Sequence, residues 1–229
     1  MNKALRIIGI IVVIVLIIAA IIASMTIKPP AEAEVWDEQM TIGNQDAKNH
    51  FIVYSDLVCP YCIAFENAIL EEEEEFHKYI EKNDILFEVR LSDFLYEYGE
   101  HNPINSRYSA VATYCAKDEG KFWDYYNLAI KTLWKDYFKD NGKSAVSKIS
   151  AMEKDYWIDL GKQVGLGDDF VSCVKNDTPL STIKSNAART ADQVNGLPAF
   201  KLNNYSPPGF SMDGTWEDVK AFFKKGLSS

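Results

Sequence analysis

The sequence predicts an α/β domain with a four-stranded sheet that a block of helices interrupts. Strand character occurs at residues 49–55 and 85–91, on either side of a helical segment, and returns only at residues 199–203. The pattern of residues 105–195 is helical, with breaks at glycine, asparagine and proline. We therefore expect strand, helix, strand, inserted helices, a hairpin and a closing helix, in that order.

Length and composition allow one domain of ordinary size with a substantial core. The chain has 229 residues, of which 47% are hydrophobic and 13% are aromatic, as in globular proteins. Its formal net charge of −9 makes nucleic acid an unexpected partner, because phosphate backbones attract basic surfaces. The three histidines, His50, His77 and His101, lack metal-ligand spacing, so we expect no metal site.

The N-terminal segment predicts a membrane anchor. Residues 7–27 carry no charge and are long enough to cross the lipid bilayer as a helix. A cleaved signal peptide would have a shorter apolar core and a clear small-x-small site, so an anchor that stays attached is favoured over a cleaved one. Basic residues before the span place the N-terminus in the cytoplasm and the rest of the chain outside the membrane.

The segments after the anchor predict spacer, strand, helix and strand. Residues 29–40 are acidic, contain two prolines and predict a spacer. The apolar run 49–55 has strand length and suits the middle of a sheet. A helix is expected over residues 60–81, with the acidic residues 71–75 on its solvated face, before the alternating strand 85–91.

The later segments predict inserted helices and then a return to the sheet. The aromatic residues of segment 122–137 are expected to pack helices rather than to line a ligand groove. Residues 199–203 and 209–212 flank turn-forming residues and predict a hairpin, and residues 215–218 predict a capping box for the last helix. The expected parts are the tip and signal-anchor 1–28, the spacer 29–40, the sheet domain 41–101 with 190–229, and the helical insertion 102–189.

Cys59 and Cys62, separated by Pro60 and Tyr61, lie at the exit of the first strand. Two thiols at this spacing at a helix start can close into a disulfide and reopen by exchange. Pro60 suits the first helical position, which leaves Cys59 beside outward-pointing backbone amides and Cys62 one turn further in. We expect Cys59 to be the attacked thiol, favoured as thiolate by the helix dipole, and Cys62 to be the resolving thiol. A zinc half-site and a structural disulfide are the alternatives.

The other two cysteines, Cys115 and Cys173, fall in the helical part of the chain. An even count of four cysteines in an extracytoplasmic chain fits one active pair and one structural pair. On spacing alone, two independent buried thiols and a four-cysteine zinc site remain alternatives.

The order of these features gives the chain a resemblance to a known family. The two cysteines at a strand-to-helix turn are followed by a helical insertion, and then by the Gly-Leu-Pro-Ala-Phe segment of residues 196–200 before a strand. In this order the chain resembles thioredoxin-fold proteins of the DsbA-like class, from about residue 41 to the last helix. The resemblance implies a thioredoxin fold with a four- to five-stranded mixed sheet, and Cys59 and Cys62 as the catalytic pair.

The resemblance also implies contacts beyond this pair. The bond between Leu197 and Pro198 should be cis, face the two sulfurs and offer its backbone to an extended substrate peptide, with an ordinary trans proline as the alternative. Cys115 and Cys173 should pair as a structural disulfide. No cofactor is implied beyond the redox-active disulfide.

Two positions depart from the family's pattern. Many relatives carry an acidic residue six positions before the first cysteine, where it assists proton transfer at the inner thiol, and this position is Val53. Asp56 and Glu66 are near in sequence, and the sequence leaves open whether either compensates. Leu197 stands where many relatives have Thr or Val, a position that tunes redox potential and substrate fit.

The expected function is that of an oxidase that is anchored in the bilayer through residues 7–27. It would pass its disulfide to exported cysteine-containing proteins and be reoxidised by a membrane thiol-oxidising partner. A reductase or isomerase of the same fold, and a non-catalytic peptide-binding or chaperone module, are the alternatives. A monomer is expected, because the short spacer holds no dimerisation domain.

Overall fold

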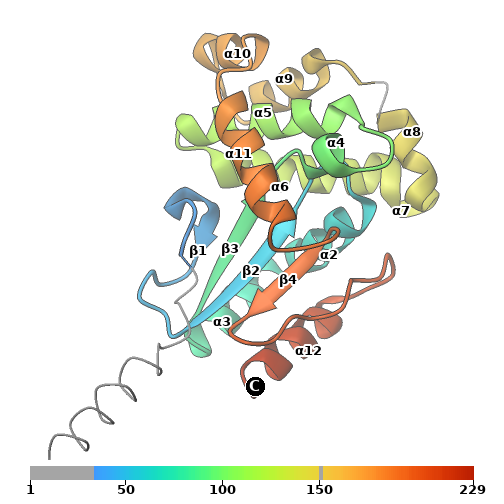
Figure 1. Cartoon of the computed structure of the whole chain (residues 1–229). Helices are drawn as coiled ribbons and strands as arrows, with labels where there is room; N and C mark the ends of the chain where they lie inside the picture. The colour runs from blue at the N-terminus through green and yellow to red at the C-terminus, as the bar shows by residue number, and fades with distance from the viewer. Residues whose placement is uncertain (1–33, 150–151) are drawn as a thin grey trace, which may run out of the picture. The chain divides into compact units, whose positions relative to one another are not determined.

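The structure, a computed structural model, describes residues 34–149 and 152–229 (Figure 1). No helix in these two stretches has the length and apolar character needed to cross a membrane, and the predicted anchor lies outside them. The elements in chain order are η1 (Glu38–Met40), β1 (Thr41–Ile42), β2 (Asn49–Ser55), α2 (Pro60–Leu70), α3 (Glu73–Lys82), β3 (Ile85–Leu91), α4 (Phe94–Tyr98), α5 (Ile104–Asp118), α6 (Phe122–Leu133), η2 (Trp134–Phe138), α7 (Lys139–Asn141), η3 (Gly142–Ala145), α8 (Val146–Ile149), α9 (Lys154–Gln163), α10 (Asp168–Lys175), α11 (Leu180–Ala191), β4 (Ala199–Leu202) and α12 (Trp216–Gly226).

A four-stranded mixed sheet in the order β1-β3-β2-β4 organises the domain. The central strands β2 and β3 are parallel, with Phe51 opposite Phe87, while β1 and β4 run antiparallel to their neighbours. Because a parallel pair needs a crossover, α2 and α3 lie between β2 and β3 in the chain. The predicted α/β class with a mixed sheet is confirmed.

The predicted hairpin is wrong. Residues 209–212 form no strand, and after β4 the chain makes a single bridge between Leu202 and Tyr205. Pro207 and Pro208 lie at the start of this stretch and have no backbone N–H to donate to a ladder. The fourth strand is instead β1, from the N-terminal side of the domain.

The helix predicted over residues 60–81 is two helices. The first ends at Leu70, the chain turns at Glu71 and Glu72, and the second begins at Glu73. One continuous helix would stack like charges one turn apart, which is destabilising. The break instead places three acids in the first turn of α3, where the helix dipole stabilises negative charge.

Aromatic residues form the core on one face of the sheet. The ring centroid of Phe51, in β2, lies 6.2 Å from that of Phe65 in α2 and 4.6 Å from that of Phe223 in α12. Phe87 of β3 stacks on the same ring at 5.8 Å. Helices α2 and α12 therefore pack on this face, and the predicted capping box that starts α12 is confirmed.

The opposite face of the sheet carries a buried ionic cluster. Glu88 and Arg90 of β3 form an ion pair with an N–O distance of 3.0 Å. Arg90 also donates a hydrogen bond to the Tyr54 hydroxyl at 3.1 Å and lies over the Trp36 ring, 4.5 Å from its centroid. Glu88 and Arg90 thus partner each other, and this pairing offsets part of the free-energy cost of burying two charges away from water.

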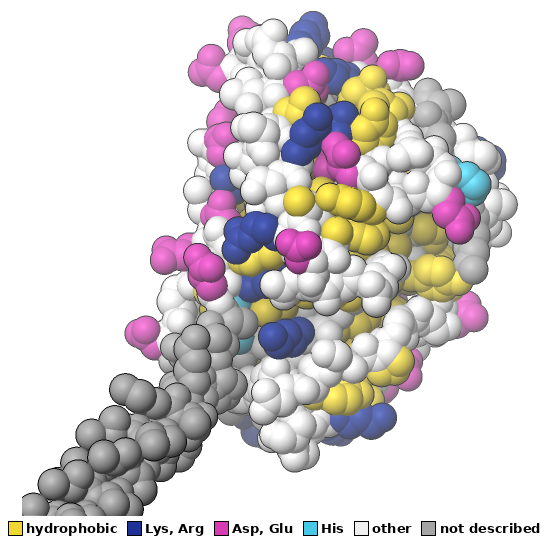
Figure 2. All heavy atoms as spheres, viewed as in Figure 1, with side chains coloured by type: hydrophobic (Ala, Val, Ile, Leu, Met, Phe, Trp, Pro, Cys, Tyr) yellow, Lys and Arg dark blue, Asp and Glu magenta, His cyan; other side chains and the backbone are white. Residues whose placement is uncertain are grey.

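Helices α5 to α11 lie between β3 and β4 in the chain and gather at one end of the sheet in Figure 1. Phe122, Tyr125 and Tyr126 of α6 are buried, as expected for helix packing, although Trp123 and Tyr126 also line a cavity. On the face shown in Figure 2, acidic and basic side chains are interspersed, with apolar side chains between them. This face therefore carries no patch of a single charge.

Candidate active site

Helix α2 begins at the cysteine pair. Cys59 is the N-cap residue, with an extended backbone (φ −81°, ψ 114°), and Pro60 is the first helical residue, so the predicted helix start is confirmed. The Cys62 backbone N–H donates a hydrogen bond to the Cys59 sulfur at 3.4 Å. Both cysteines are free thiols, and Pro60 and Tyr61 between them are half-buried. The geometry places the first sulfur at the positive end of the helix, where backbone amides favour negative charge.

Both thiols are buried, Cys62 more completely than Cys59. Cys59 is 3% exposed, whereas Cys62 is completely buried. Burial raises the pKa of the Cys62 thiol well above its ordinary value, the neighbouring Cys59 and Glu66 raise it further, and the backbone of Asp56 opposes the rise. In the dithiol form Cys62 therefore holds its proton, and Cys59, at the N-cap, is the sulfur nearer to solvent.

The cis-proline segment lies at the same end of the sheet as this loop. The Leu197–Pro198 bond is cis, as the resemblance implies. Strand β4 starts at the next residue and runs antiparallel to β2, with Ala199 opposite Tyr54. Pro198, directly before β4, therefore lies beside the end of β2, from which the chain continues to Cys59. Pro198 is buried and Leu197 is half-exposed.

Asp56 holds the loop between β2 and α2 in place. It is fully buried, and its Oδ1 accepts a hydrogen bond from the Val58 backbone N–H at 3.0 Å. Its Oδ2 accepts from the Leu95 backbone N–H at 3.0 Å and from the Ser106 hydroxyl at 2.6 Å. Burial raises the pKa of Asp56 to about 6, while these hydrogen bonds limit the rise. This side chain ties the loop to α4 and α5.

Glu66 lies one turn beyond Cys62 on α2 and is 4% exposed. Its Oε1 accepts a hydrogen bond from the Ser55 hydroxyl at 2.7 Å, and the Tyr126 hydroxyl donates to that same serine oxygen at 3.2 Å. Its Oε2 has no hydrogen-bond partner among the described residues. Burial raises the pKa of Glu66 to about 7, against the effect of the Tyr126 and Ser55 hydroxyls. The sequence shows this residue only as an acid near the cysteine pair, and its burial becomes visible in the structure.

The second cysteine pair is a disulfide. Cys115 of α5 and Cys173 of α10 are joined by an S–S bond of 2.04 Å. Neither sulfur is then available to a metal ion. Within residues 34–149 and 152–229, no group of three or more His, Cys, Asp or Glu side chains is placed to hold one. Of the three histidines, His50 pairs with Glu88, with an N–O distance of 2.9 Å.

Comparisons with known sequences extend over most of the chain. The family described as Thioredoxin matches residues 36–225. A protein of Rickettsia bellii (strain RML369-C), provisionally assigned as a protein-disulfide oxidoreductase, is 21% identical over 180 residues. The match covers 77% of this chain, and this chain spans 61% of the length of that relative.

Solved structures share the fold. Wolbachia pipientis alpha-DsbA1 matches with a TM-score of 0.58 and 14% identity, over 82% of this chain and 90% of that chain. A protein-disulfide isomerase from Novosphingobium aromaticivorans matches with a TM-score of 0.55 and 15% identity, over 82% of this chain and 97% of that chain. The resemblance found in the sequence is confirmed: the chain belongs to the thioredoxin family and has a DsbA-like architecture.

Proposed function

We propose that this protein is a thiol:disulfide oxidoreductase that works as an oxidase and introduces disulfides into exported proteins. The observation that carries the proposal is the asymmetry of the pair. Cys59 caps the helix and keeps 3% exposure, while Cys62, one turn further in, is fully buried and protonated. A sulfur at a helix N-terminus is a good leaving group, and stabilisation of its reduced form makes the Cys59–Cys62 disulfide oxidising.

The reaction runs by two exchanges. A substrate thiolate attacks the Cys59 sulfur of the disulfide form, the Cys59–Cys62 bond breaks, and Cys62 takes the electron pair and a proton. A second substrate thiolate then attacks the substrate sulfur of the mixed disulfide and releases Cys59 as a thiolate. Two electrons pass from two substrate thiols to the pair, and a membrane thiol-oxidising partner removes them again. Leu197, at the cis bond, would hold the substrate as an extended strand.

Trapping the mixed disulfide tests the proposal. In the Cys62→Ser variant the resolving thiol is absent, so exported cysteine-containing proteins should accumulate in disulfide linkage to Cys59. Non-reducing gels of cells that express the full chain would show these adducts, and reductant would remove them. The matched control is the double variant Cys59→Ala, Cys62→Ser, which should form none. Absence of adducts with the single variant would contradict the proposal.

The equilibrium of the pair with glutathione separates oxidase from reductase. A potential near about −120 to −180 mV supports the oxidase, and one below roughly −230 mV supports a reductase. Position 53, where an acid would assist the inner thiol, is a fully buried valine in β2, which favours the oxidase. If the Cys59→Ala variant keeps full activity in cells, the protein is a peptide-binding module instead.

We further propose that residues 7–27 anchor the protein in the membrane and that the domain lies outside the cytoplasm. Support comes from the uncharged run itself and from the Cys115–Cys173 disulfide, since such bonds persist in oxidising compartments. A C-terminal reporter that is active only outside the cytoplasm should be active on the full chain. It should lose activity when residues 1–28 are deleted. Activity without these residues would contradict the proposal.

A further inference from the structure

The segment that carries the cis proline connects α11 to β4. It comprises residues 192–198, which form turns and bends rather than a helix or a strand. The segment ends where β4 begins, at Ala199, which stands opposite Tyr54 of β2. Because residues 192–198 belong to no ladder, side-chain contacts decide how firmly the segment is held.

Tyr54 meets this segment at both of its ends. At the end toward β4, the residue is the ladder partner of Ala199. At the end toward α11, the Tyr54 hydroxyl donates a hydrogen bond of 2.9 Å to the Oε1 of Gln193. Gln193 lies four residues before Leu197 in the chain, and Tyr54 is only 1% exposed. One buried residue therefore sets the distance between the two ends of the segment.

Arg90 sets the direction of the hydrogen bond to Gln193. Its Nη1 donates to the Tyr54 oxygen at 3.1 Å. A guanidinium group can only donate, so the hydroxyl proton is left for an acceptor, and the amide oxygen of Gln193 faces it. Burial raises the pKa of Tyr54, although Arg90 opposes the rise, so the hydroxyl keeps its proton near neutral pH. Arg90, Tyr54 and Gln193 thus form a chain of hydrogen bonds in which each strengthens the next.

Contacts on several sides hold the Arg90 guanidinium in place. Glu88 pairs with it at 3.0 Å, and the Trp36 backbone N–H donates to the other oxygen of Glu88 at 2.7 Å. The guanidinium carbons of Arg90 and Arg189 lie 4.5 Å and 4.0 Å from the centroid of the Trp36 ring. Arg189 is in the last turn of α11, the helix that leads into the segment. The indole ring therefore links β3 to the end of this helix through two cation–π contacts.

We propose that Tyr54 and Gln193 are positioning residues for the substrate: their hydrogen bond holds the cis-proline segment so that the Leu197 backbone can pair with an extended peptide. This inference rests on the proposed function. Neither side chain takes part in the exchange of sulfur atoms. A small dithiol that reaches Cys59 without backbone pairing does not need the bond, whereas a peptide substrate does.

The test compares two reductants of the Cys59–Cys62 disulfide in the purified full chain. One is dithiothreitol, and the other is an unstructured peptide that carries two cysteines. The rate of reduction at rising peptide concentrations gives a half-saturating concentration and a maximal rate. In Tyr54→Phe the half-saturating concentration should rise about 3- to 10-fold, as expected for the loss of one hydrogen bond. The maximal rate and the rate with dithiothreitol should stay as in the wild type.

Variants of Gln193 show whether the hydrogen bond itself carries the effect. Gln193→Leu removes the acceptor and should raise the half-saturating concentration as Tyr54→Phe does. The double variant Tyr54→Phe, Gln193→Leu should go no further than either single variant, because both remove the same interaction. Gln193→Glu keeps an oxygen acceptor and should keep the wild-type value. Effects that multiply in the double variant would contradict the inference.

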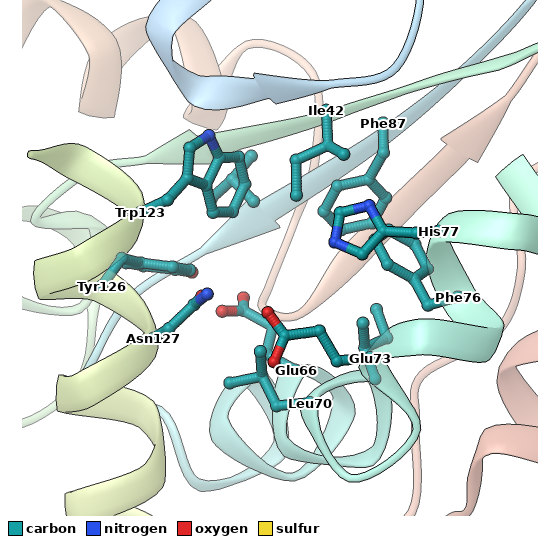
Figure 3. Close-up of a pocket in the computed structure, with 12 residues that line it drawn as sticks. Ile42, Glu66, Leu70, Glu73, Phe76, His77, Phe87, Trp123, Tyr126 and Asn127 are labelled. Atoms are coloured by element: carbon teal, nitrogen blue, oxygen red, sulfur yellow. The ribbon is translucent and has the colours of Figure 1, made fainter. Parts of the chain in front are cut away.

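Two control variants separate positioning from general damage to the fold. Tyr125→Phe removes another buried hydroxyl, which donates to the Trp157 carbonyl at 3.1 Å within the helical insertion. Trp123→Leu alters a cavity that side chains of β1, α3 and α6 line (Figure 3), a second recess that could receive a peptide. Both controls should react with the two reductants as the wild type does.

Three outcomes would overturn the inference while the proposed function stands. Tyr54→Phe could keep the wild-type half-saturating concentration, or it could slow the reaction with dithiothreitol as much as that with the peptide. Either control variant could raise the half-saturating concentration as much as Tyr54→Phe does. If the wild-type disulfide reacts with neither reductant, the proposed function fails and this inference with it.

Discussion

The ionised carboxyl group of Glu66 lowers the free energy of unfolding, because it is buried, whereas a neutral amide at this position would not. Its pKa of about 7 lies above the ordinary 4.5, so between these values the folded protein binds a proton that the unfolded chain has released. The free energy of unfolding therefore falls as the pH rises through this interval. At 1.36 kcal/mol per pKa unit the loss reaches about 3 kcal/mol above pH 7.

This sign gives a prediction for the stability of Glu66→Gln. At pH 8 the variant should have a free energy of unfolding higher than the wild type by up to about 3 kcal/mol, and at pH 4 the two should differ little. Urea denaturation of the dithiol form at both pH values measures the difference. A variant less stable than the wild type at pH 8 contradicts the prediction.

Residue roles could be predicted from the sequence only where local rules decide them. Cys59 at the N-cap follows from Pro60 at the first helical position, and both are read from four adjacent residues. The difference between Asp56 and Glu66 depends on distant contacts. Ser106, from an inserted helix, donates to Asp56, whereas Tyr126, from another, donates to Ser55, which in turn donates to Glu66.

At the scale of elements, the loop before α2 is held by helices of the insertion. Asp56 accepts hydrogen bonds from the Leu95 N–H, at α4, and from the Ser106 hydroxyl of α5. Ser106 helps to hold down the pKa of Asp56, which burial raises to about 6. The insertion is therefore part of the support of the cysteine pair.

Ser106→Ala should lower the free energy of unfolding by about 1.5–3 kcal/mol above pH 6, where Asp56 is charged. The loss should be smaller at pH 4, where the carboxyl is protonated and needs the donor less. Chemical denaturation at the two pH values checks this dependence. Ser109→Ala is the matched control, since that buried hydroxyl donates to the Ser106 carbonyl instead of to a carboxylate. Equal losses for the two variants at pH 8 would contradict the prediction.

Helices and strands could be predicted from the periodicity of the sequence, but the pairing of strands and the break within a helix could not. The apolar face of α2 continues into α3, so the pattern of Phe65, Ile69, Phe76 and Ile80 does not reveal the turn between the helices. The hairpin failed for a different reason. The strand β4 is at the edge of the sheet, but the chain beside it makes only the Leu202–Tyr205 bridge among the described residues before Pro207 and Pro208, which cannot donate to a ladder.

At the scale of the molecule, the Cys115–Cys173 disulfide closes a loop between α5 and α10. The two cysteines are 58 residues apart, and a loop of that length gives about 4 kcal/mol of stabilisation in the chain-entropy view. The double variant Cys115→Ala, Cys173→Ala should lose about this much free energy of unfolding. Its folded form should still react with dithiothreitol at Cys59. Loss of that reaction below the unfolding transition would show that the bond also shapes the active site.

The buried ion pair of Glu88 and Arg90 also fixes the register of β3 against β2. A slip of β3 by one residue against β2 would turn the side chains of Glu88 and Arg90 to the face of the sheet that Phe51 and Phe87 occupy. Both charges would then be buried among aromatic side chains, so misaligned pairings are strongly disfavoured. The same slip would move the end of the strand by about 3.3 Å. Such a shift would pull the Leu95 N–H, which follows β3, away from the Asp56 carboxylate, and the loop that presents Cys59 would lose this support.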